Sequence, residues 1–277
     1  GMQSWQWHPF LYRFRKKFQF IIPDWRGFGG SSQCKIPALD AISSHWQDLH
    51  CLMNQLNIHQ YRVIAYSMGA TTAMHGMQYG NFADKIQSYL HIDQTPKICS
   101  NPDWPYGLFG TRHPEFIDIL ESISDVLTRN ANALFIDQLH SADRASLLQS
   151  WLAFIDMQAS SQVAPLLIKQ AFKHPSLQSH ILPIRRLDYL AWYISNYLHH
   201  QEDYRTAIAQ LDKPATFFIG EQSKLYPADG QKIIANSLND ATAVIFKKSG
   251  HTPLLSEPFK FSKEIGKFLQ NCEETKA

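Results

Sequence analysis

The sequence lacks the features that mark membrane-embedded and secreted proteins. Its 277 residues are 44% hydrophobic, yet no apolar run approaches the roughly 18 residues that a membrane-spanning helix requires. The chain also shows no secretory signal peptide. These absences give no reason to expect a membrane protein or a secreted one.

Cysteine and net charge are equally sparse. The four cysteines are scattered without metal-ligand spacing, which favours reduced thiols in a cytoplasmic protein. The net charge is +2, too small to imply a polyanionic partner such as a nucleic acid. The one basic cluster, residues 13–17, is more typical of a solvated helix end than of a nucleic-acid surface.

Motifs for nucleotides, metals and flavins are missing as well. The glycine-rich stretch Trp25–Ser32 is followed by no Walker lysine and no dinucleotide-binding spacing. A tight loop at the end of a strand explains these glycines better than a phosphate cradle. We therefore expect no cofactor.

The most informative stretch is Tyr61–Met74. It begins with a β-branched run, typical of a buried strand, and ends in small residues and Met, typical of a packed helix. Ser67 lies between them, with Ala65 two positions before it and Gly69 two positions after. Because larger side chains are expected to collide where the backbone doubles back, the pattern predicts a nucleophile elbow. The alternative is a serine that only caps the helix.

Hydrophobic periodicity divides the chain into two kinds of segment. Up to residue 97 and from residue 201 onward, strand-like runs alternate with helical ones, which predicts an α/β core with a mostly parallel sheet. Residues 98–200 show only helical periodicity and are expected to form a helical cap insertion. Besides the strand that begins at Tyr61, strands are expected at 18–22, 88–92, 215–219 and 241–246. Helices are expected at 5–17, 40–56, 116–127, 145–157, 163–172, 187–198, 228–237 and 257–270.

Polar residues follow three of the expected strands: Ser67, Asp93 and His251. The carboxyl ends of parallel strands form the edge at which open α/β sheets bind ligands. The order nucleophile, acid, base is that of the α/β-hydrolase fold. For Asp93, a turn-forming role before Pro96 is the alternative.

The chain resembles the α/β-hydrolase superfamily over nearly its whole length. The resemblance rests on Pro-Asp-Trp-Arg-Gly-Phe-Gly at 23–29, Ala-Tyr-Ser-Met-Gly at 65–69, and Gly-His-Thr-Pro at 250–253 with Glu257-Pro258 behind it. It implies an α/β-hydrolase core of residues 1–97 and 201–277, with the cap inserted between them. It also implies an esterase- or lactonase-like enzyme.

The resemblance further implies the roles of the site residues. His251 would take the proton from Ser67, Asp93 would hold the imidazole, and the Met68 N–H would donate to the oxyanion. Superfamily members usually have the acid in the turn that corresponds to residues 220–223, where this chain has Ser223. Because a minority have it after the strand that follows the elbow helix, Asp93 is our candidate and Glu221 the alternative.

Superfamily members also have a central strand and an oxyanion loop ahead of the Pro-Asp turn. This chain begins too close to Asp24 to include that strand, so we expect the N-terminal strands to be absent from it. Met2 or Gln3 would then supply the second oxyanion donor, and Tyr66 is a further candidate binding residue. A sheet without a middle strand exposes apolar edges, which favours a homo-oligomer.

Three functions remain open at this point. The first is hydrolysis of a small to medium ester, thioester or lactone with an apolar part, through an acyl-enzyme on Ser67. The second is a cofactor-free oxygenase or haloperoxidase-like reaction in which the His251–Asp93 pair deprotonates the substrate. Its model is the ring-cleaving 2,4-dioxygenases of 3-hydroxy-4-oxoquinolines, although those enzymes flank the serine with histidines and this chain has Tyr66 and Met68. The third is a non-catalytic binding protein on the hydrolase scaffold.

Overall fold

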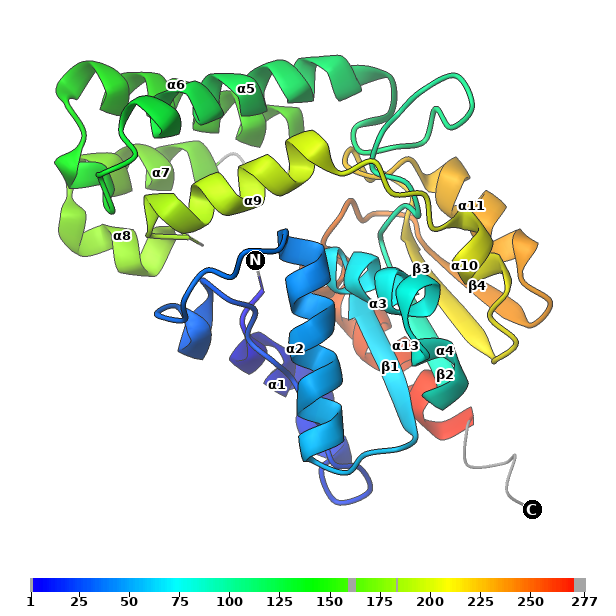
Figure 1. Cartoon of the computed structure of the whole chain (residues 1–277). Coiled ribbons are helices and arrows are strands. Elements are labelled where there is room, and N and C mark those ends of the chain that lie inside the picture. The colour runs from blue at the N-terminus through cyan, green and yellow to red at the C-terminus, as the bar shows by residue number, and fades with distance from the viewer. Residues whose placement is uncertain (1, 159–162, 183, 272–277) are drawn as a thin grey trace. The chain divides into compact units, whose positions relative to one another are not determined.

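The computed structural model describes residues 2–158, 163–182 and 184–271 (Figure 1). Its contacts group the chain into two compact units. The helical unit comprises residues 1–41 and 114–199, and the sheet unit comprises residues 42–113 and 200–277. Residues 1–41 thus group with helices, whereas the sequence placed them with the core. The assignment of residues 98–200 to a cap stays a prediction.

The sheet unit is built on four parallel strands in the order β1-β2-β3-β4. The register pairs Tyr66 with Ile92 and Gly220 with Phe246, the last residues of their strands. The carboxyl ends therefore lie side by side at one edge, as the sequence predicted. The strands are β1 (Tyr61–Tyr66), β2 (Ile86–Ile92), β3 (Ala215–Gly220) and β4 (Ala241–Phe246).

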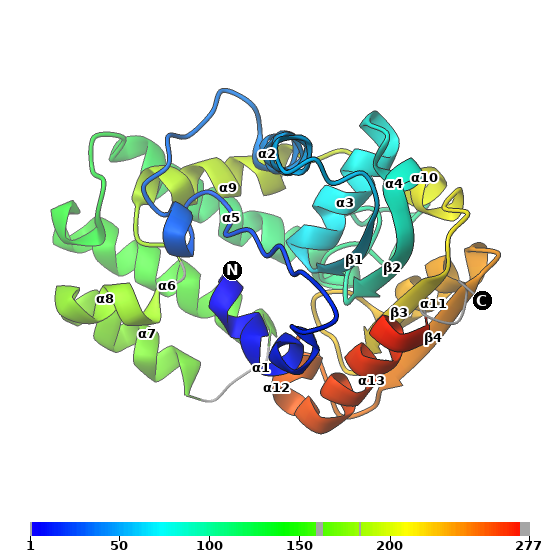
Figure 2. The ribbon, with the colours of Figure 1, turned by 90° about the horizontal axis from the view of Figure 1, so that it is seen from below.

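Helices cover both faces of this sheet (Figure 2). On one face, apolar residues of α2, α3, α4, α10 and α11 share a core with the strands. On the other face, Phe261 of α13 packs against Phe218 and Phe246, with ring centroids 5.7 and 6.2 Å away. The helices are α2 (Ala41–Gln55), α3 (Met68–Tyr79), α4 (Phe82–Lys85), η4 (Gly110–Arg112), α10 (Arg205–Ala209), α11 (Ala228–Ser237), α12 (Pro253–Ser256) and α13 (Pro258–Asn271).

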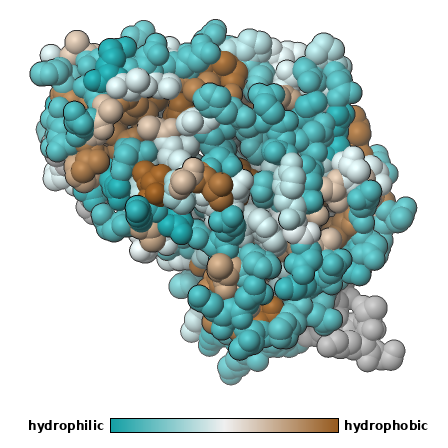
Figure 3. Space-filling view, viewed as in Figure 1, coloured by the Kyte–Doolittle hydropathy of each residue, from teal (hydrophilic) through white to brown (hydrophobic). Residues whose placement is uncertain are grey.

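The helical unit contains the four long helices expected after residue 98. Exposed apolar side chains there include Leu166 and Leu167 of α7, and Figure 3 shows apolar side chains among polar ones on the face that it presents. Among the described residues, no helix combines the length and apolar character needed to cross a membrane. The unit comprises η1 (Ser4–Trp7), α1 (His8–Leu11), η2 (Tyr12–Phe14), η3 (Gly29–Ser31), α5 (His113–Arg129), η5 (Ile136–Gln138), α6 (Ser141–Gln158), α7 (Ala164–Lys173), α8 (Pro175–Ile181) and α9 (Leu187–His199), where η marks a 3-10 helix.

Two expectations for the N-terminal segment are corrected. The helix expected over 5–17 ends at Phe14 and alternates between 3-10 and α geometry. The strand expected at 18–22 does not form a ladder with any described strand. An apolar, β-branched run favours extended backbone, but only a hydrogen-bonded partner makes it a strand.

Candidate active site

Ser67 lies in the sharp turn between β1 and α3. Its backbone has φ 53° and ψ −125°, a conformation that residues other than glycine rarely adopt. Its N–H donates to the carbonyl of Ile92 at 3.1 Å, which joins the turn to the end of β2. Although Ser67 occupies the N-cap position of α3, its side chain makes no capping hydrogen bond. The helix-cap alternative is therefore wrong, and the turn has the geometry of an elbow.

Neighbouring elements leave room for a methyl group at Gly69. A Cβ built on Gly69 has no heavy atom of the described chain within 4 Å, with its chain neighbours and the backbone of α3 set aside. Ala65, on the other side of the elbow, is buried in the shared core.

The amide of Met68 is the expected oxyanion donor. Met68 is the first residue of α3, so its N–H is among the four that have no carbonyl acceptor within the helix. The helix dipole adds partial positive charge at the same place. The Gln3 amide differs, because its N–H donates to the Gln6 side-chain oxygen at 2.7 Å. Gln3 is therefore a poor oxyanion donor, and a role for Met2 stays a prediction.

Asp93 follows β2 directly and is completely buried. Its carboxylate accepts four hydrogen bonds. Oδ1 accepts from the Gly220 N–H at 3.2 Å and from Gln231 Nε2 at 3.0 Å, and Oδ2 accepts from Ser223 Oγ at 2.8 Å and from His251 Nδ1 at 2.7 Å. A buried carboxylate is tolerated only with such donors around it.

The contact with Asp93 determines the tautomer of His251. Because the carboxylate only accepts, Nδ1 is the protonated nitrogen of the ring. Nε2 of the neutral ring is then unprotonated and can act as a base. The alternative acid, Glu221, is exposed at the start of the turn after β3. The structure therefore brings Asp93, rather than Glu221, to the histidine.

Two tyrosines flank the His251 ring. Tyr66 stacks on it with ring centroids 5.1 Å apart and an interplanar angle of 24°. Its hydroxyl donates to the His251 carbonyl at 3.0 Å. Burial, together with the charge of Asp93, raises the pKa of that hydroxyl, so it remains a donor at neutral pH. Tyr226 lies at 5.4 Å from the ring. Tyr66, predicted as a binding residue, thus supports the histidine.

The loop that holds His251 is fixed by Glu257. Its Oε1 accepts from the Lys248 N–H and from Ser249 Oγ, both at 2.9 Å. Glu257 stood behind the Gly-His-Thr-Pro motif in the sequence, and this pair of contacts gives it a structural role.

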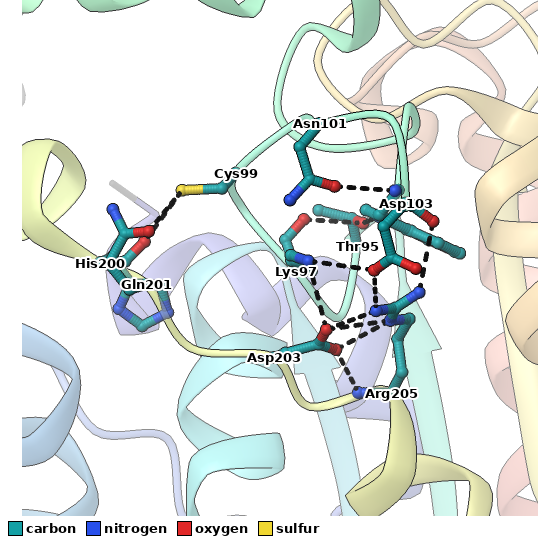
Figure 4. A network of polar contacts seen from close by, with 10 residues as sticks. Thr95, Lys97, Cys99, Asn101, Asp103, His200, Gln201, Asp203 and Arg205 are labelled. Atoms are coloured by element: carbon teal, nitrogen blue, oxygen red, sulfur yellow. Dashed lines mark hydrogen bonds and ion pairs between the residues drawn. The ribbon is translucent and has the colours of Figure 1, made fainter.

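The segment after Asp93 is fixed by a polar network (Figure 4). Lys97 lies 3.3 Å from Asp103 and 3.4 Å from Asp203. Arg205 pairs with the same two carboxylates at 2.5 and 2.6 Å. Hydrogen bonds from Arg205 and Lys97 lower the pKa of Asp103. The network ties the loop beyond β2 to the start of α10.

Sequence reasoning missed Gln231 and Tyr226. Gln231 is buried on the same face of α11 as Ile234 and Ala235. A glutamine on the apolar face of a predicted helix was the available signal. No comparable signal marked Tyr226, because the residue lies in a loop.

Comparison with known proteins identifies the family. A model of the alpha/beta hydrolase family matches residues 1–264. The chain belongs to the alpha/beta hydrolase family. This confirms the predicted resemblance, the predicted fold and the predicted hydrolase class. In this alpha/beta hydrolase the candidate acid comes directly after β2, and Ser223 lies in the turn after β3, where the resemblance led us to expect an acid.

Individual relatives of this alpha/beta hydrolase are distant. It is 20% identical to a pimeloyl-[acyl-carrier protein] methyl ester esterase from Nitrosomonas europaea over 261 aligned residues. The aligned region covers 94% of this chain and 89% of the relative. Its fold is similar to that of an esterase from Exiguobacterium antarcticum, with TM-score 0.68, 17% identity, and coverage of 96% and 87%. It is also similar to the enol-lactonase from Burkholderia xenovorans, with TM-score 0.65, 16% identity, and coverage of 96% and 86%.

Proposed function

We propose that this protein hydrolyses the carboxylic ester, thioester or lactone bond of a small to medium substrate with an apolar part, through an acyl-enzyme on Ser67. The observation on which the proposal rests is the hydrogen bond from His251 Nδ1 to the fully buried Asp93 carboxylate. It supplies an oriented base beside the strained turn of Ser67, because Tyr66, the residue before the serine, stacks on the His251 ring.

In the first half-reaction, Ser67 Oγ attacks the carbonyl carbon while His251 Nε2 takes the hydroxyl proton. Asp93 stabilises the imidazolium that forms, and the Met68 N–H donates to the negatively charged oxygen of the tetrahedral intermediate. The bond from the carbonyl carbon to the leaving oxygen or sulfur then breaks. His251 returns its proton to the leaving group, which departs as an alcohol or thiol or, when the substrate is a lactone, remains on the acyl chain as a free hydroxyl.

In the second half-reaction, water takes the place of the leaving group. His251 Nε2 removes a proton from the water, and the resulting hydroxide attacks the acyl carbon. The ester bond to Ser67 breaks, the serine oxygen regains its proton from His251, and the carboxylic acid product is released. Both halves use the same base and the same oxyanion donor.

The relatives support this choice of bond. Three of the similar proteins are a methyl ester esterase, an esterase and an enol-lactonase, and each of these classes of enzyme cleaves an acyl–oxygen bond. A serine at the elbow suits acyl transfer, because its ester is a true covalent intermediate that water can cleave.

The test is intact-mass analysis after treatment with a fluorophosphonate, a reagent that phosphonylates activated serines. We expect one adduct on the native chain and none on Ser67→Ala. Ser122→Ala, which removes an exposed helical serine, is the matched control and should be labelled like the native chain. A panel of p-nitrophenyl esters of increasing acyl length then defines the substrate range.

Absence of an adduct on folded native protein would contradict the proposal. If oxygen were consumed with a 3-hydroxy-4-oxoquinoline instead, the His251–Asp93 pair would serve as a base in the alternative oxygenase reaction. Absence of both reactions would favour a binding protein.

A further inference from the structure

Gln231 is a buried polar residue whose contacts are unusual. It lies in the first turns of α11 and is 1% exposed. Its Nε2 donates to Asp93 Oδ1 at 3.0 Å and to the Tyr226 carbonyl at 2.9 Å. Its Oε1 is buried and has no hydrogen-bond partner in the described part of the chain. The side chain is therefore satisfied on one side only.

The orientation of the Gln231 amide is determined by its two acceptors. Both protons of Nε2 face oxygens, one of Asp93 and one of Tyr226. A rotated amide would place Oε1 against the same two oxygens, which is repulsive because all three only accept. An unpaired buried carbonyl oxygen costs free energy. Gln231 bears this cost while it donates to Asp93, and such exceptions call for a functional explanation.

The neighbouring hydroxyl of Ser223 has a fixed direction too. Ser223 Oγ accepts from the Tyr226 N–H at 3.3 Å, so its own proton points to Asp93 Oδ2 at 2.8 Å. With the Gly220 N–H at 3.2 Å, three donors from one segment surround the carboxylate. Of these three donors, Gln231 is the one whose side chain donates to Oδ1.

We propose that Gln231 is a positioning residue for the proposed hydrolase reaction and acts through Asp93. By holding Oδ1, it keeps the plane of the carboxylate turned so that Oδ2 meets His251 Nδ1. Without it, Oδ1 keeps only the longer contact with the Gly220 amide, and the carboxylate can rotate about its Cβ–Cγ bond. The inference rests on the proposed function, since Asp93 is useful only if His251 acts as a base.

The variant that tests this is Gln231→Met, which keeps the length of the side chain but has no donor and no unpaired oxygen. We expect kcat on a p-nitrophenyl ester, and the rate of fluorophosphonate labelling, to fall by about 10- to 100-fold with KM unchanged. The thermal midpoint should fall, because the Asp93 carboxylate and the Tyr226 carbonyl each lose a donor, so the rates are compared at a temperature at which both proteins are fully folded. A kcat equal to the native value under those conditions would indicate a merely structural role and overturn the inference.

The matched control is Gln222→Met. Gln222 is exposed in the preceding turn, and its Nε2 donates to the Lys247 carbonyl at 3.0 Å. Its rates should equal those of the native chain. Should Gln231→Met fail to fold, Gln231→Leu also lacks a donor and an unpaired oxygen, and should show the same loss.

A double-mutant cycle identifies the residue through which Gln231 acts. In an Asp93→Asn background, Gln231→Met should cause no further loss of kcat, because the carboxylate that it positions is gone. Additive losses would show that Gln231 acts elsewhere and would overturn the inference.

An NMR measurement separates this inference from the proposed function. The proton between His251 Nδ1 and Asp93 Oδ2 should give a far-downfield signal that disappears in His251→Gln. We expect Gln231→Met to shift or broaden this signal and Gln222→Met to leave it unchanged. If the native protein shows the signal but is never labelled at Ser67, the proposed function fails, and the signal alone still tests whether Gln231 orients the Asp93 carboxylate. An unchanged signal in Gln231→Met would overturn the role.

Discussion

At the scale of single residues, the candidate nucleophile and the candidate acid share a backbone feature. Ser67 has φ 53° and Asp93 has φ 43°. Left-handed backbone at residues other than glycine costs about 1–3 kcal/mol and persists where the surroundings impose it. Each residue ends a strand and turns the chain abruptly out of the sheet. The edge that holds the candidate site thus stores strain at two neighbouring strand ends.

This strain predicts an order of stability among inactive variants. Ser67→Gly and Ser67→Ala both lack the nucleophile, so neither should react with a fluorophosphonate. Glycine adopts positive φ without steric cost, whereas alanine keeps the Cβ clash. We expect Ser67→Gly to be more stable than Ser67→Ala by about 1 kcal/mol in urea unfolding. An alanine variant as stable as the glycine variant would show that the turn is unstrained.

At the scale of an element, two glycines of α3 have opposite surroundings. A Cβ at Gly76 would lie 2.5 Å from the Trp46 ring of α2, whereas a Cβ at Gly69 would meet nothing within 4 Å in the described chain. Gly76 therefore sets how closely α2 approaches α3. Gly69 has no such packing role.

The two glycines give a matched pair of substitutions. Gly76→Ala should lower the free energy of unfolding by about 1–3 kcal/mol, because the ring of Trp46 must move. Gly69→Ala should leave it unchanged or raise it by up to about 1 kcal/mol, since alanine favours the helix. Urea unfolding of both variants measures the two changes in the free energy of unfolding. Equal losses would mean that helix packing does not discriminate between the two positions.

The elements also show what the sequence could predict. Strand β4 and helix α11 match their expected ranges, because turn residues such as Asn239-Asp240 and Pro227 bound clear hydrophobic patterns. The order of strands and polar residues predicted that Asp93 and His251 lie at the same edge of the sheet. In the structure a hydrogen bond connects them. Periodicity could not show that residues 18–22 find no partner strand among the described residues. Nor could it show the contact of Gln231 with Asp93, which depends on how α11 packs.

At the scale of the whole molecule, a buried histidine couples the fold to pH. His91 lies inside β2, where its Nε2–H donates to the Gln94 carbonyl at 3.1 Å. Nδ1 therefore accepts from the Tyr89 hydroxyl at 3.0 Å. Burial lowers the pKa of His91 to about 4. The folded state thus disfavours a proton that the unfolded chain binds near its ordinary pKa of about 6.5.

The direction of the pH effect follows from that difference. Above about pH 6.5, His91 is neutral in both the folded and the unfolded state, and no stability is lost. As the pH falls toward about 4, only the unfolded chain gains the proton, which favours unfolding. His91 alone should lower the free energy of unfolding by about 2 kcal/mol between about pH 7.5 and about pH 5.

Urea unfolding at the two pH values measures this effect. His91→Gln removes the titration and should show a smaller loss than the native chain, whatever its stability at the higher pH. The exposed His59 provides the control, since His59→Gln should lose as much as the native chain. Equal losses in native protein and His91→Gln would refute the assignment.

The direct pairing of β2 with β3 has a consequence for refolding. Ile92 and Phe218 are partners in the ladder, although the segment from Asp93 to Pro214 separates the two strands in sequence. Closing so long a loop is entropically costly and slow. The groups that donate hydrogen bonds to Asp93 all lie at the end of β3 or after it in the sequence. The carboxylate therefore has none of these donors until the loop has closed. Recovery of labelling at Ser67 would then lag behind recovery of helical signal, and the reactive serine would report the last step of folding.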